Sequence, residues 1–256
     1  MILHAAEAGH GPPLALLHGL FGAGRNLGFV QRRLSGAFRV LAIDLRNHGA
    51  SPHAAAMDYA SMAADVAEML AAREALPAAL LGHSMGGKVA MRLALEQAGR
   101  VRALVVADIA SVSYPPHHRD LLQAMQRLTL IPGLTRTAAD AALAGSVPDP
   151  RVRGFLLQNL IVGQNPSWRI GLAEIAAAMP ALEDFPPLPG ACYAGPALFV
   201  AGGRSDYLTA AHRPLIVSLF PQARFAVLPD AGHWLHADDP EGFLAAVVPF
   251  LSEFAS

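Results

Sequence analysis

Short runs of apolar residues recur along the chain, separated by longer stretches in which polar residues return at regular intervals. Six runs show little polar alternation, at residues 14–19, 39–45, 78–82, 102–109, 197–202 and 223–229. Strands covered by helices on both faces have this character, whereas half-exposed strands alternate polar and apolar positions. The pattern therefore predicts six buried strands in a mostly parallel sheet.

Helical spacing marks several of the segments between these runs. Apolar residues recur three and four positions apart at 59–74 and 88–97, and Asp58 is placed to cap the first of these helices. Another apolar helix is predicted at 240–254. Strands that alternate with helices predict an α/β fold, a doubly wound central sheet flanked by helices.

The stretch from residue 111 to residue 195 interrupts this alternation. It holds four segments of helical character, at 118–128, 138–143, 152–161 and 170–179, and no strand signal. A loop of a compact domain is much shorter than this. The sequence therefore predicts a helical cap, residues 111–195, inserted into an α/β core made of residues 1–110 and 196–256.

Composition narrows the class of protein. The chain has 256 residues, 53% of them hydrophobic and 15% charged, which is enough to bury a large core. A net charge of −1 offers no basic surface for nucleic acid, and the single Cys192 excludes an internal disulfide or a cysteine metal cluster. Since neither a signal peptide nor a membrane-length apolar run is visible, we expect a cytoplasmic monomer or homodimer with no membrane partner.

A G-x-S-x-G sequence lies between one predicted strand and the next predicted helix, at residues 82–86. This arrangement is typical of the nucleophile elbow, in which a serine occupies a very tight strand-to-helix turn. The glycines let the two backbones approach, and the helix N-terminus offers amide donors beside the serine. Ser84 is therefore the predicted nucleophile, and the alternative is a glycine-rich turn that contains a serine by chance.

A glycine-containing loop, HGLFG at residues 18–22, follows the first predicted strand. In folds with a nucleophile elbow this loop supplies one amide of the oxyanion hole, and the residue after the nucleophile supplies the other. We assign these donors to the backbone amides of Leu20 and Met85. Taken alone, residues 18–22 also fit a simple tight turn.

A histidine after the last predicted strand completes the chemistry. In DAGHWLHADDP, residues 230–240, His233 is placed to take the proton of the serine during attack and return it to the leaving group. His236 is the alternative base. A metal site built on His-x-x-His is not favoured, because no glutamate or cysteine joins the pair.

Four segments in this order resemble the α/β-hydrolase superfamily: HGLFG (18–22), DLRNHG (44–49), GHSMGGKVAM (82–91) and GHWLHAD (232–238). Together they closely resemble small bacterial esterases of the YbfF type and their mitochondrial abhydrolase-domain relatives. The resemblance implies hydrolysis of carboxylic esters or acyl thioesters without a cofactor.

The acid that orients the histidine has two candidates. Most of the superfamily places it where this chain has Asp206, after the strand at 197–202, whereas the YbfF-type esterases are similar to this chain around Asp108. Asp108 is therefore favoured over Asp206, with Glu174 of the predicted cap as a minor alternative. Each aspartate also has a structural interpretation, as a helix cap for Asp108 and as a partner of turn amides for Asp206.

The remaining candidates are mostly packing or surface residues. Phe21 and Trp234 adjoin the catalytic loops and are expected to line the acyl pocket. Lys88 and residues 46–48 are interpreted as structural. His117 and His118 are expected to be solvated, and Cys192 to be buried.

These features predict a serine hydrolase for esters or thioesters of small to medium acyl chains, acting through an acyl-enzyme. Perhydrolysis, C–C bond hydrolysis and acyl transfer use the same residues and stay open, as does a binding protein that keeps this fold as a small-molecule receptor. Haloalkane dehalogenases and epoxide hydrolases are not favoured, because they have aspartate at the position of Ser84.

Overall fold

The computed structural model describes residues 1–255, and a seven-stranded sheet forms its centre. The six predicted strands are all present, and each begins and ends within two residues of its predicted bounds. A seventh strand, which the sequence pattern did not predict, lies at one edge. The strands are β1 (Ala5–Ala8), β2 (Pro13–Leu17), β3 (Arg39–Ile43), β4 (Ala78–His83), β5 (Val101–Ala107), β8 (Ala197–Gly202) and β9 (Ala223–Leu228).

The strands follow the order β1-β3-β2-β4-β5-β8-β9. All neighbouring pairs are parallel except β1 with β3, which is antiparallel. Strands β2, β4 and β5 are almost completely buried, as parallel strands covered on both faces must be. The predicted doubly wound α/β architecture is confirmed.

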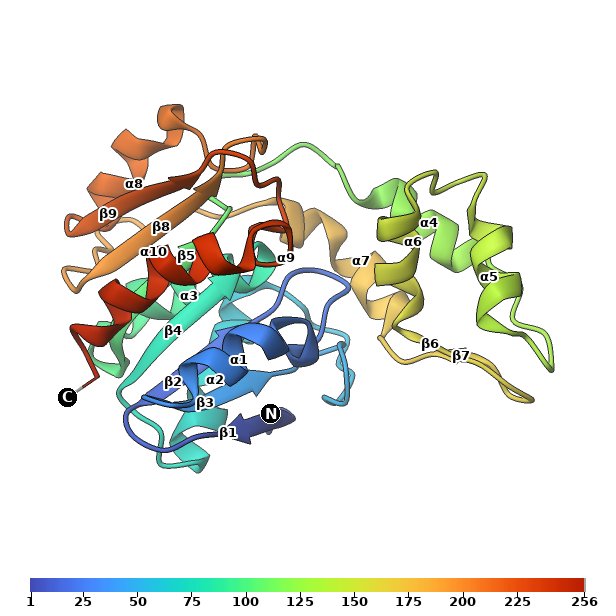
Figure 1. Ribbon diagram of the computed structural model, residues 1–256, viewed down its shortest axis with the longest axis horizontal. Coiled ribbons are helices and arrows are strands. Elements are labelled where there is room, and N and C mark those ends of the chain that lie inside the picture. Colours follow the sequence, from blue (N-terminus) through green and yellow to red (C-terminus); the bar gives the residue numbers. More distant parts are fainter. Residues whose placement is uncertain (256) are drawn as a thin grey trace.

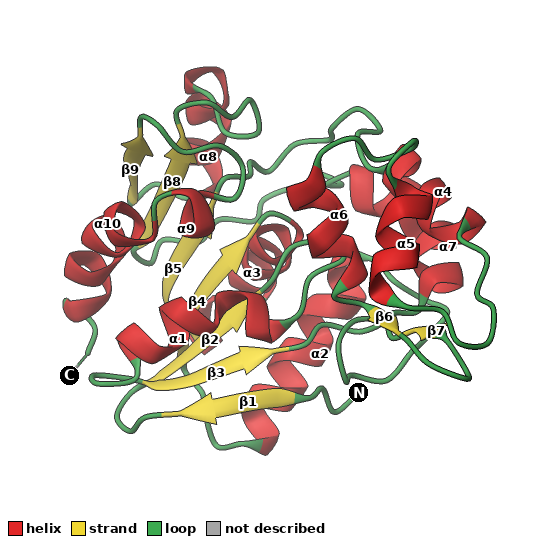
Figure 2. Ribbon diagram, turned by 45° about the vertical axis from the view of Figure 1, so that its right-hand side comes forward, coloured by secondary structure: helices red, strands yellow, loops and turns green. Residues whose placement is uncertain are grey.

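Helices cover both faces of the sheet, as Figure 2 shows. On one face, α1 (Gly28–Leu34) and α10 (Pro240–Ser252) pack against the sheet. On the other lie α2 (Tyr59–Ala72), α3 (Met85–Glu96) and α8 (Arg213–Leu219). The predicted cap of α2 is confirmed, because the Asp58 carboxylate accepts a hydrogen bond from the Ser61 amide at 2.8 Å.

The segment 111–195 leaves the sheet and forms a separate helical layer, on the right in Figure 1. It contains α4 (Arg119–Arg127), α5 (Arg136–Leu143), α6 (Pro150–Leu157) and α7 (Leu172–Glu183). The expectation of no strand in this segment was wrong. Two residues of β6 (Leu160–Ile161) pair with two of β7 (Ser167–Trp168), too short a hairpin to leave an alternating pattern.

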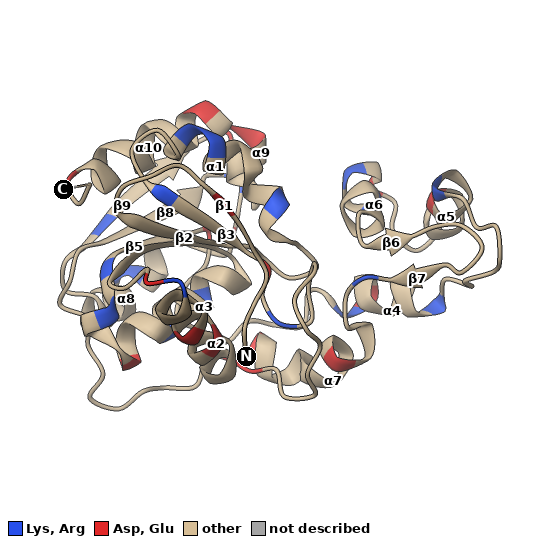
Figure 3. Ribbon diagram, turned by 90° about the horizontal axis from the view of Figure 1, so that it is seen from below, with Lys and Arg blue, Asp and Glu red and all other residues tan. Residues whose placement is uncertain are grey.

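The carboxyl ends of β2, β4, β5, β8 and β9 lie along one edge of the sheet, because these strands are parallel. The loops that follow β2, β4, β5 and β9 carry the residues predicted for chemistry, and the short helix α9 (Leu235–Asp238) follows the last of them. Ligands of open α/β sheets bind at this edge. Figure 3 shows that Lys and Arg positions are interspersed with Asp and Glu positions over both the core and the segment 111–195.

Candidate active site

The turn between β4 and α3 holds Ser84 in a strained backbone conformation, with φ 52° and ψ −120°. The flanking glycines are required by space. A Cβ on Gly82 would lie 2.2 Å from the Gly86 oxygen, and a Cβ on Gly86 would lie 2.3 Å from the Leu17 oxygen. The backbone atoms cannot shift far enough to make room for a Cβ at either position. Helix α3 therefore begins directly after the serine, three residues earlier than its apolar pattern predicted.

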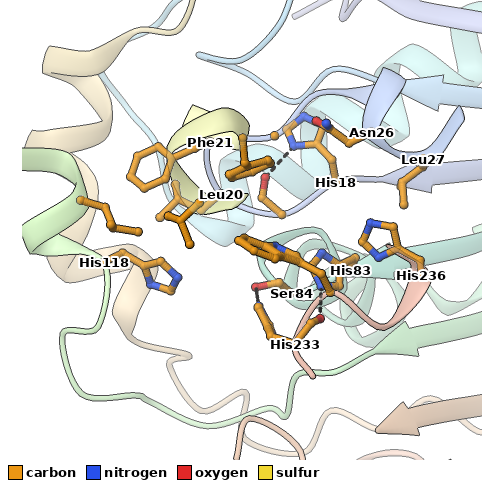
Figure 4. A pocket seen from close by; sticks show the side chains of 16 residues that line it. His18, Leu20, Phe21, Asn26, Leu27, His83, Ser84, His118, His233 and His236 are labelled. Carbon is orange, nitrogen blue, oxygen red and sulfur yellow. Dashed lines mark hydrogen bonds between the residues drawn. The ribbon is translucent and has the colours of Figure 1, made fainter. Parts of the chain in front are cut away.

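Ser84, His233 and Asp108 form a continuous hydrogen-bonded chain. The Ser84 Oγ lies 3.0 Å from His233 Nε2, and His233 Nδ1 lies 2.8 Å from Asp108 Oδ2. A carboxylate only accepts, so Nδ1 carries the ring proton and Nε2 is available to accept from the hydroxyl. Figure 4 shows the Ser84 and His233 side chains pointing at one another.

The carboxylate of Asp108 is completely buried and well supplied with donors. Its Oδ1 accepts from the Gly202 amide at 2.9 Å, and its Oδ2 accepts from the Ser205 hydroxyl as well as from His233. These three donors fix the orientation of the carboxylate toward His233. The residue also has φ 51°, so the loop after β5 turns sharply to present it.

Asp206, the other candidate acid, is not brought to the histidine. Its side chain is exposed and has no hydrogen bond or ion pair within residues 1–255. Glu174 is half-buried in the first turn of α7 and has no contact with His233. Of the three carboxyl groups considered from the sequence, only that of Asp108 contacts His233.

Two aromatic side chains that the sequence reasoning missed hold His233 in place. Tyr207 stacks on its ring with centroids 4.1 Å apart. His83, the residue before Ser84, donates from Nε2 to the backbone oxygen of His233 at 2.8 Å. Burial keeps the pKa of His83 well below its usual value, so this ring stays neutral. No local sequence signal marks either contact, because each joins distant parts of the chain.

His236, the alternative base, contacts His83 rather than Ser84. Its ring lies edge-on to that of His83, with centroids 4.7 Å apart. Burial lowers the pKa of His236 to about 4, and its Nδ1 is buried without a hydrogen-bond partner in the described part of the chain. The geometry favours His233 over His236 as the partner of the serine.

Residues 19–22 form a β-turn directly against Ser84. The Gly22 amide donates to the Gly19 oxygen at 3.0 Å, and a Cβ on Gly19 would lie 3.3 Å from the Cβ of Ser84. The backbone amides of Leu20 and Met85 have no acceptor within residues 1–255. These are the two amides that the sequence assigned to an oxyanion hole, and the first turn of α3 adds its positive dipole end at the same place.

Two buried histidines hold this turn. His18 donates from Nδ1 to the Gly19 oxygen at 2.8 Å. His48 accepts the Phe21 amide at Nε2, at 3.1 Å, and donates from Nδ1 to the Arg46 oxygen at 2.9 Å. Burial lowers the pKa of both rings, that of His48 to about 3, so each keeps one neutral tautomer.

Two pockets open at Ser84, and His118 and Leu20 line both of them. The first, named here the His233 pocket and drawn in Figure 4, is lined by residues that include His233, Trp234, His236, Phe21, Val152 and Phe155. The second, named the Lys88 pocket, is lined by residues that include Met85, Lys88, Ile109, Met179, Leu182 and Tyr207.

Lys88 is the only lysine of the chain, and the other members of its Lys and Arg set are all arginines. It is 2% exposed, and its Nζ donates to the Asp184 oxygen at 3.0 Å and lies 4.9 Å from the centre of the Tyr114 ring. Burial lowers the pKa of Lys88 to about 8. Its contacts join α3 to the end of α7, in line with the structural interpretation.

Two expectations about single residues were wrong. His118 is not solvated, since it lines both pockets, faces the Phe21 ring at 6.5 Å and has its pKa lowered to about 4 by burial. Cys192 is exposed rather than buried, on the loop that leads into β8. Phe21 and Trp234 do line a pocket, and it is the one that also contains His233.

Within residues 1–255, no group of three or more His, Cys, Asp or Glu side chains is arranged to hold a metal ion. No helix in that range is long and apolar enough to cross a membrane.

A family model described as "Alpha/beta hydrolase family" matches residues 14–246. The sn-1-specific diacylglycerol lipase ABHD11 of Mus musculus is 39% identical over 250 residues, which cover 94% of this chain and 81% of the mouse protein. The esterase YbfF of Escherichia coli is 35% identical over 242 residues, covering 94% of this chain and 93% of that protein.

Among solved structures, a marine microorganism esterase superposes with a TM-score of 0.95 at 34% identity. The match covers 98% of this chain and all of the other. The backbone of this chain is thus similar to that of an esterase over nearly its whole length.

Proposed function

The chain belongs to the alpha/beta hydrolase family and is a hydrolase of the esterase type, and from this we propose that it cleaves carboxylic esters or acyl thioesters through an acyl-enzyme on Ser84. The single observation that carries the proposal is the hydrogen-bonded chain from Ser84 through His233 to Asp108. A serine, a histidine and a buried carboxylate linked in this order activate the serine hydroxyl.

In the first half of the reaction, Ser84 Oγ attacks the carbonyl carbon while His233 Nε2 takes the hydroxyl proton. Asp108 stabilises the positive imidazolium that forms. The carbonyl oxygen becomes an oxyanion that accepts hydrogen bonds from the amides of Leu20 and Met85. Loss of one such donor costs roughly 3 kcal/mol in the transition state, so these amides add a large contribution to that of the triad.

The tetrahedral intermediate then collapses. The bond between the carbonyl carbon and the leaving oxygen or sulfur breaks, and His233 returns its proton to the leaving group. A water molecule replaces the leaving group, His233 takes a proton from it, and the resulting hydroxide attacks the acyl-enzyme. Collapse of the second intermediate releases the carboxylic acid and restores the proton to Ser84.

The two pockets suit the two halves of an ester. The leaving group must lie near His233 Nε2, from which it receives its proton, so we assign it to the His233 pocket. The Lys88 pocket contains Ile109, Met179 and Leu182 and suits an aliphatic acyl chain. Phe21 and Trp234 would therefore contact the leaving group rather than the acyl chain, contrary to the expectation from sequence.

The segment 111–195 supplies part of both pockets, which supports its proposed role as a cap. His118, Leu121, Val152 and Phe155 contribute to the His233 pocket, and Tyr114, Met179 and Leu182 to the Lys88 pocket. We therefore propose the division into a core of residues 1–110 and 196–256 and a cap of residues 111–195.

The test is Ser84→Ala, with Ser218→Ala on the exposed face of α8 as the matched control. Hydrolysis of p-nitrophenyl butyrate should fall by several orders of magnitude in Ser84→Ala only, and a fluorophosphonate probe should label every variant except this one. Wild-type rates in Ser84→Ala would remove the serine from the mechanism. Labelling of the wild-type protein without turnover of any ester or thioester would favour a binding protein.

A further inference from the structure

One side chain of the segment 111–195 reaches the turn that carries the Leu20 amide. Asn159 lies between α6 and β6, is 1% exposed, and donates from Nδ2 to the backbone oxygen of Phe21 at 2.7 Å. Both backbone groups of Asn159 are hydrogen-bonded. Its amide donates to the Leu156 oxygen at 3.1 Å, and its oxygen accepts from the Arg169 amide at 2.8 Å. The contact is therefore a buried and well-anchored link between the segment and the core.

Two peptide groups continue this link to the nucleophile. The Phe21 oxygen shares its peptide group with the Gly22 amide, which donates to the Gly19 oxygen at 3.0 Å. The Gly19 oxygen in turn shares its peptide group with the Leu20 amide. In a planar trans peptide the C=O and N–H point in opposite directions, so each hydrogen bond fixes the direction of the next N–H.

The geometry of Phe21 shows why the turn depends on such contacts. Its φ of 60° lies in the left-handed region, which side chains larger than glycine seldom occupy. His48 holds its amide and Asn159 holds its oxygen, so both sides of the residue are fixed. A carbonyl that accepts a hydrogen bond also polarises its peptide group and makes the N–H of that group a stronger donor.

The side-chain amide of Asn159 is paired at one end only. Its Nδ2 satisfies the buried Phe21 oxygen, whereas its Oδ1 is buried without a hydrogen-bond partner in the described residues, which costs free energy. Within residues 1–255, the only side-chain hydrogen bond of Asn159 goes to the turn at residues 19–22.

We propose that Asn159 is a positioning residue for the oxyanion hole. A relay of hydrogen bonds and peptide groups runs from Asn159 through Phe21, Gly22 and Gly19 to Leu20. Through this relay, the packing of residues 150–168 against the core sets the direction of the Leu20 N–H and its strength as a hydrogen-bond donor. The inference rests on the proposed function, since it assumes that an oxyanion forms beside Ser84. It makes the segment 111–195 part of the catalytic apparatus as well as a wall of the pockets.

Two substitutions test this role. Asn159→Leu keeps the size and removes the donor together with the unpaired oxygen, and Asn159→Asp keeps the shape and presents an oxygen to the Phe21 carbonyl. Removal of a whole oxyanion donor lowers kcat by about 10²–10³. Misdirection of one donor should therefore lower kcat by about 10- to 100-fold in both variants, with KM within about twofold of wild type.

The neighbouring Gln158→Ala is the matched control. Gln158 makes a separate link between the segment and the core, accepting from Asn26 Nδ2 at 2.7 Å outside the proposed relay. Its kcat should stay within about twofold of wild type. A trifluoromethyl ketone, which forms a tetrahedral adduct on the serine, should bind the Asn159 variants more weakly by the same factor as kcat falls. A substrate-shaped amide that forms no adduct should bind them as before.

An unchanged kcat in folded Asn159→Leu, an effect on KM alone, or an equal loss in Gln158→Ala would overturn the positioning role. Urea unfolding of each variant establishes that it is folded. The two proposals fail separately. If Ser84→Ala is inactive while Asn159→Leu and Asn159→Asp keep the wild-type kcat, only the role of Asn159 is lost. If Ser84→Ala stays active, the proposed function itself fails.

Discussion

At the scale of single residues, the site is built on histidines whose protons are placed by their neighbours. His18 and His48 each donate from Nδ1 to a carbonyl and accept an amide at Nε2, while His83 donates from Nε2 to the loop of His233. Burial lowers the pKa of all three, so they stay neutral and rigid at pH 7. His233 differs, because its Nδ1 faces the carboxylate of Asp108 and not a backbone oxygen.

The roles of the two aspartates lead to a prediction. Asp108→Asn should lower kcat by about 10⁴, because an amide in place of the carboxylate favours the wrong tautomer of His233. Asp206→Asn should change kcat by no more than about tenfold, since Asp206 is exposed and makes no hydrogen bond to His233. The measurement is steady-state hydrolysis of p-nitrophenyl butyrate by both variants. The opposite ranking would transfer the role of the acid to Asp206.

The residues within local motifs were predictable from their own neighbours, whereas Asp108 was favoured over Asp206 only through a family resemblance. Ser84 and His233 stand in short sequences whose neighbours reveal their role. Asp108 and Asp206 both follow strands that end at the same edge, so position along the chain does not separate them. The tertiary structure separates them, because the Asp108 carboxylate is buried against His233 while Asp206 is exposed.

At the scale of elements, continuous apolar runs located the buried strands, and elements that lack such a run were missed. Strand β1 has the sequence AAEA at the edge of the sheet, with no fully buried residue. Helix α8 is seven residues long and keeps only Ile216 fully buried. Helix α3 began earlier than predicted because the elbow, and not helix propensity, sets its first residue; Gly86 and Gly87 are weak helix formers.

Helix α3 carries one buried charge, and this gives a prediction about stability. The pKa of Lys88 falls from 10.5 in the unfolded chain to about 8 in the folded protein. Between these values the unfolded chain binds more protons than the folded protein, so this group makes the wild-type free energy of unfolding rise with pH. Methionine does not titrate, so the stability of Lys88→Met minus that of wild type should fall by about 2 kcal/mol between pH 7 and pH 10.

Urea unfolding of both proteins at the two pH values measures this difference. Other titrating groups are common to the two proteins and cancel in the comparison. A difference that stays constant from pH 7 to pH 10 would mean that the Lys88 ammonium loses little solvation in the folded protein.

At the scale of the whole molecule, four loops from separate strands meet at one edge of the sheet, and the segment 111–195 meets them there. Ser84 consequently lies where the two pockets join, with His233 on one side and the apolar residues near Lys88 on the other. Sequence patterning predicted this edge and the helical segment. It could not predict how the segment divides the space, because that depends on contacts such as Asn159 with Phe21 that join distant residues.

This division predicts that acyl preference and leaving-group preference can be changed independently. In the wild-type protein, each added methylene of the acyl chain should favour the transition state by up to ~0.8 kcal/mol until the Lys88 pocket is full, and longer chains should then lose activity. Met179→Trp fills that pocket and should move the optimum of kcat/KM to shorter acyl chains, with the order of leaving groups unchanged.

The complementary variant is Phe155→Ala, which enlarges the His233 pocket and removes a ring that packs against Trp234 at 5.4 Å. It should raise the relative kcat/KM of esters with bulky alcohols and leave the acyl optimum where it is. A matrix of esters, graded in acyl length along one axis and in alcohol size along the other, measures both effects in one experiment. If Phe155→Ala moved the acyl optimum and Met179→Trp the alcohol preference, the two pockets would hold the opposite halves of the substrate, and His233 would have to protonate a leaving group that reaches it from the Lys88 side.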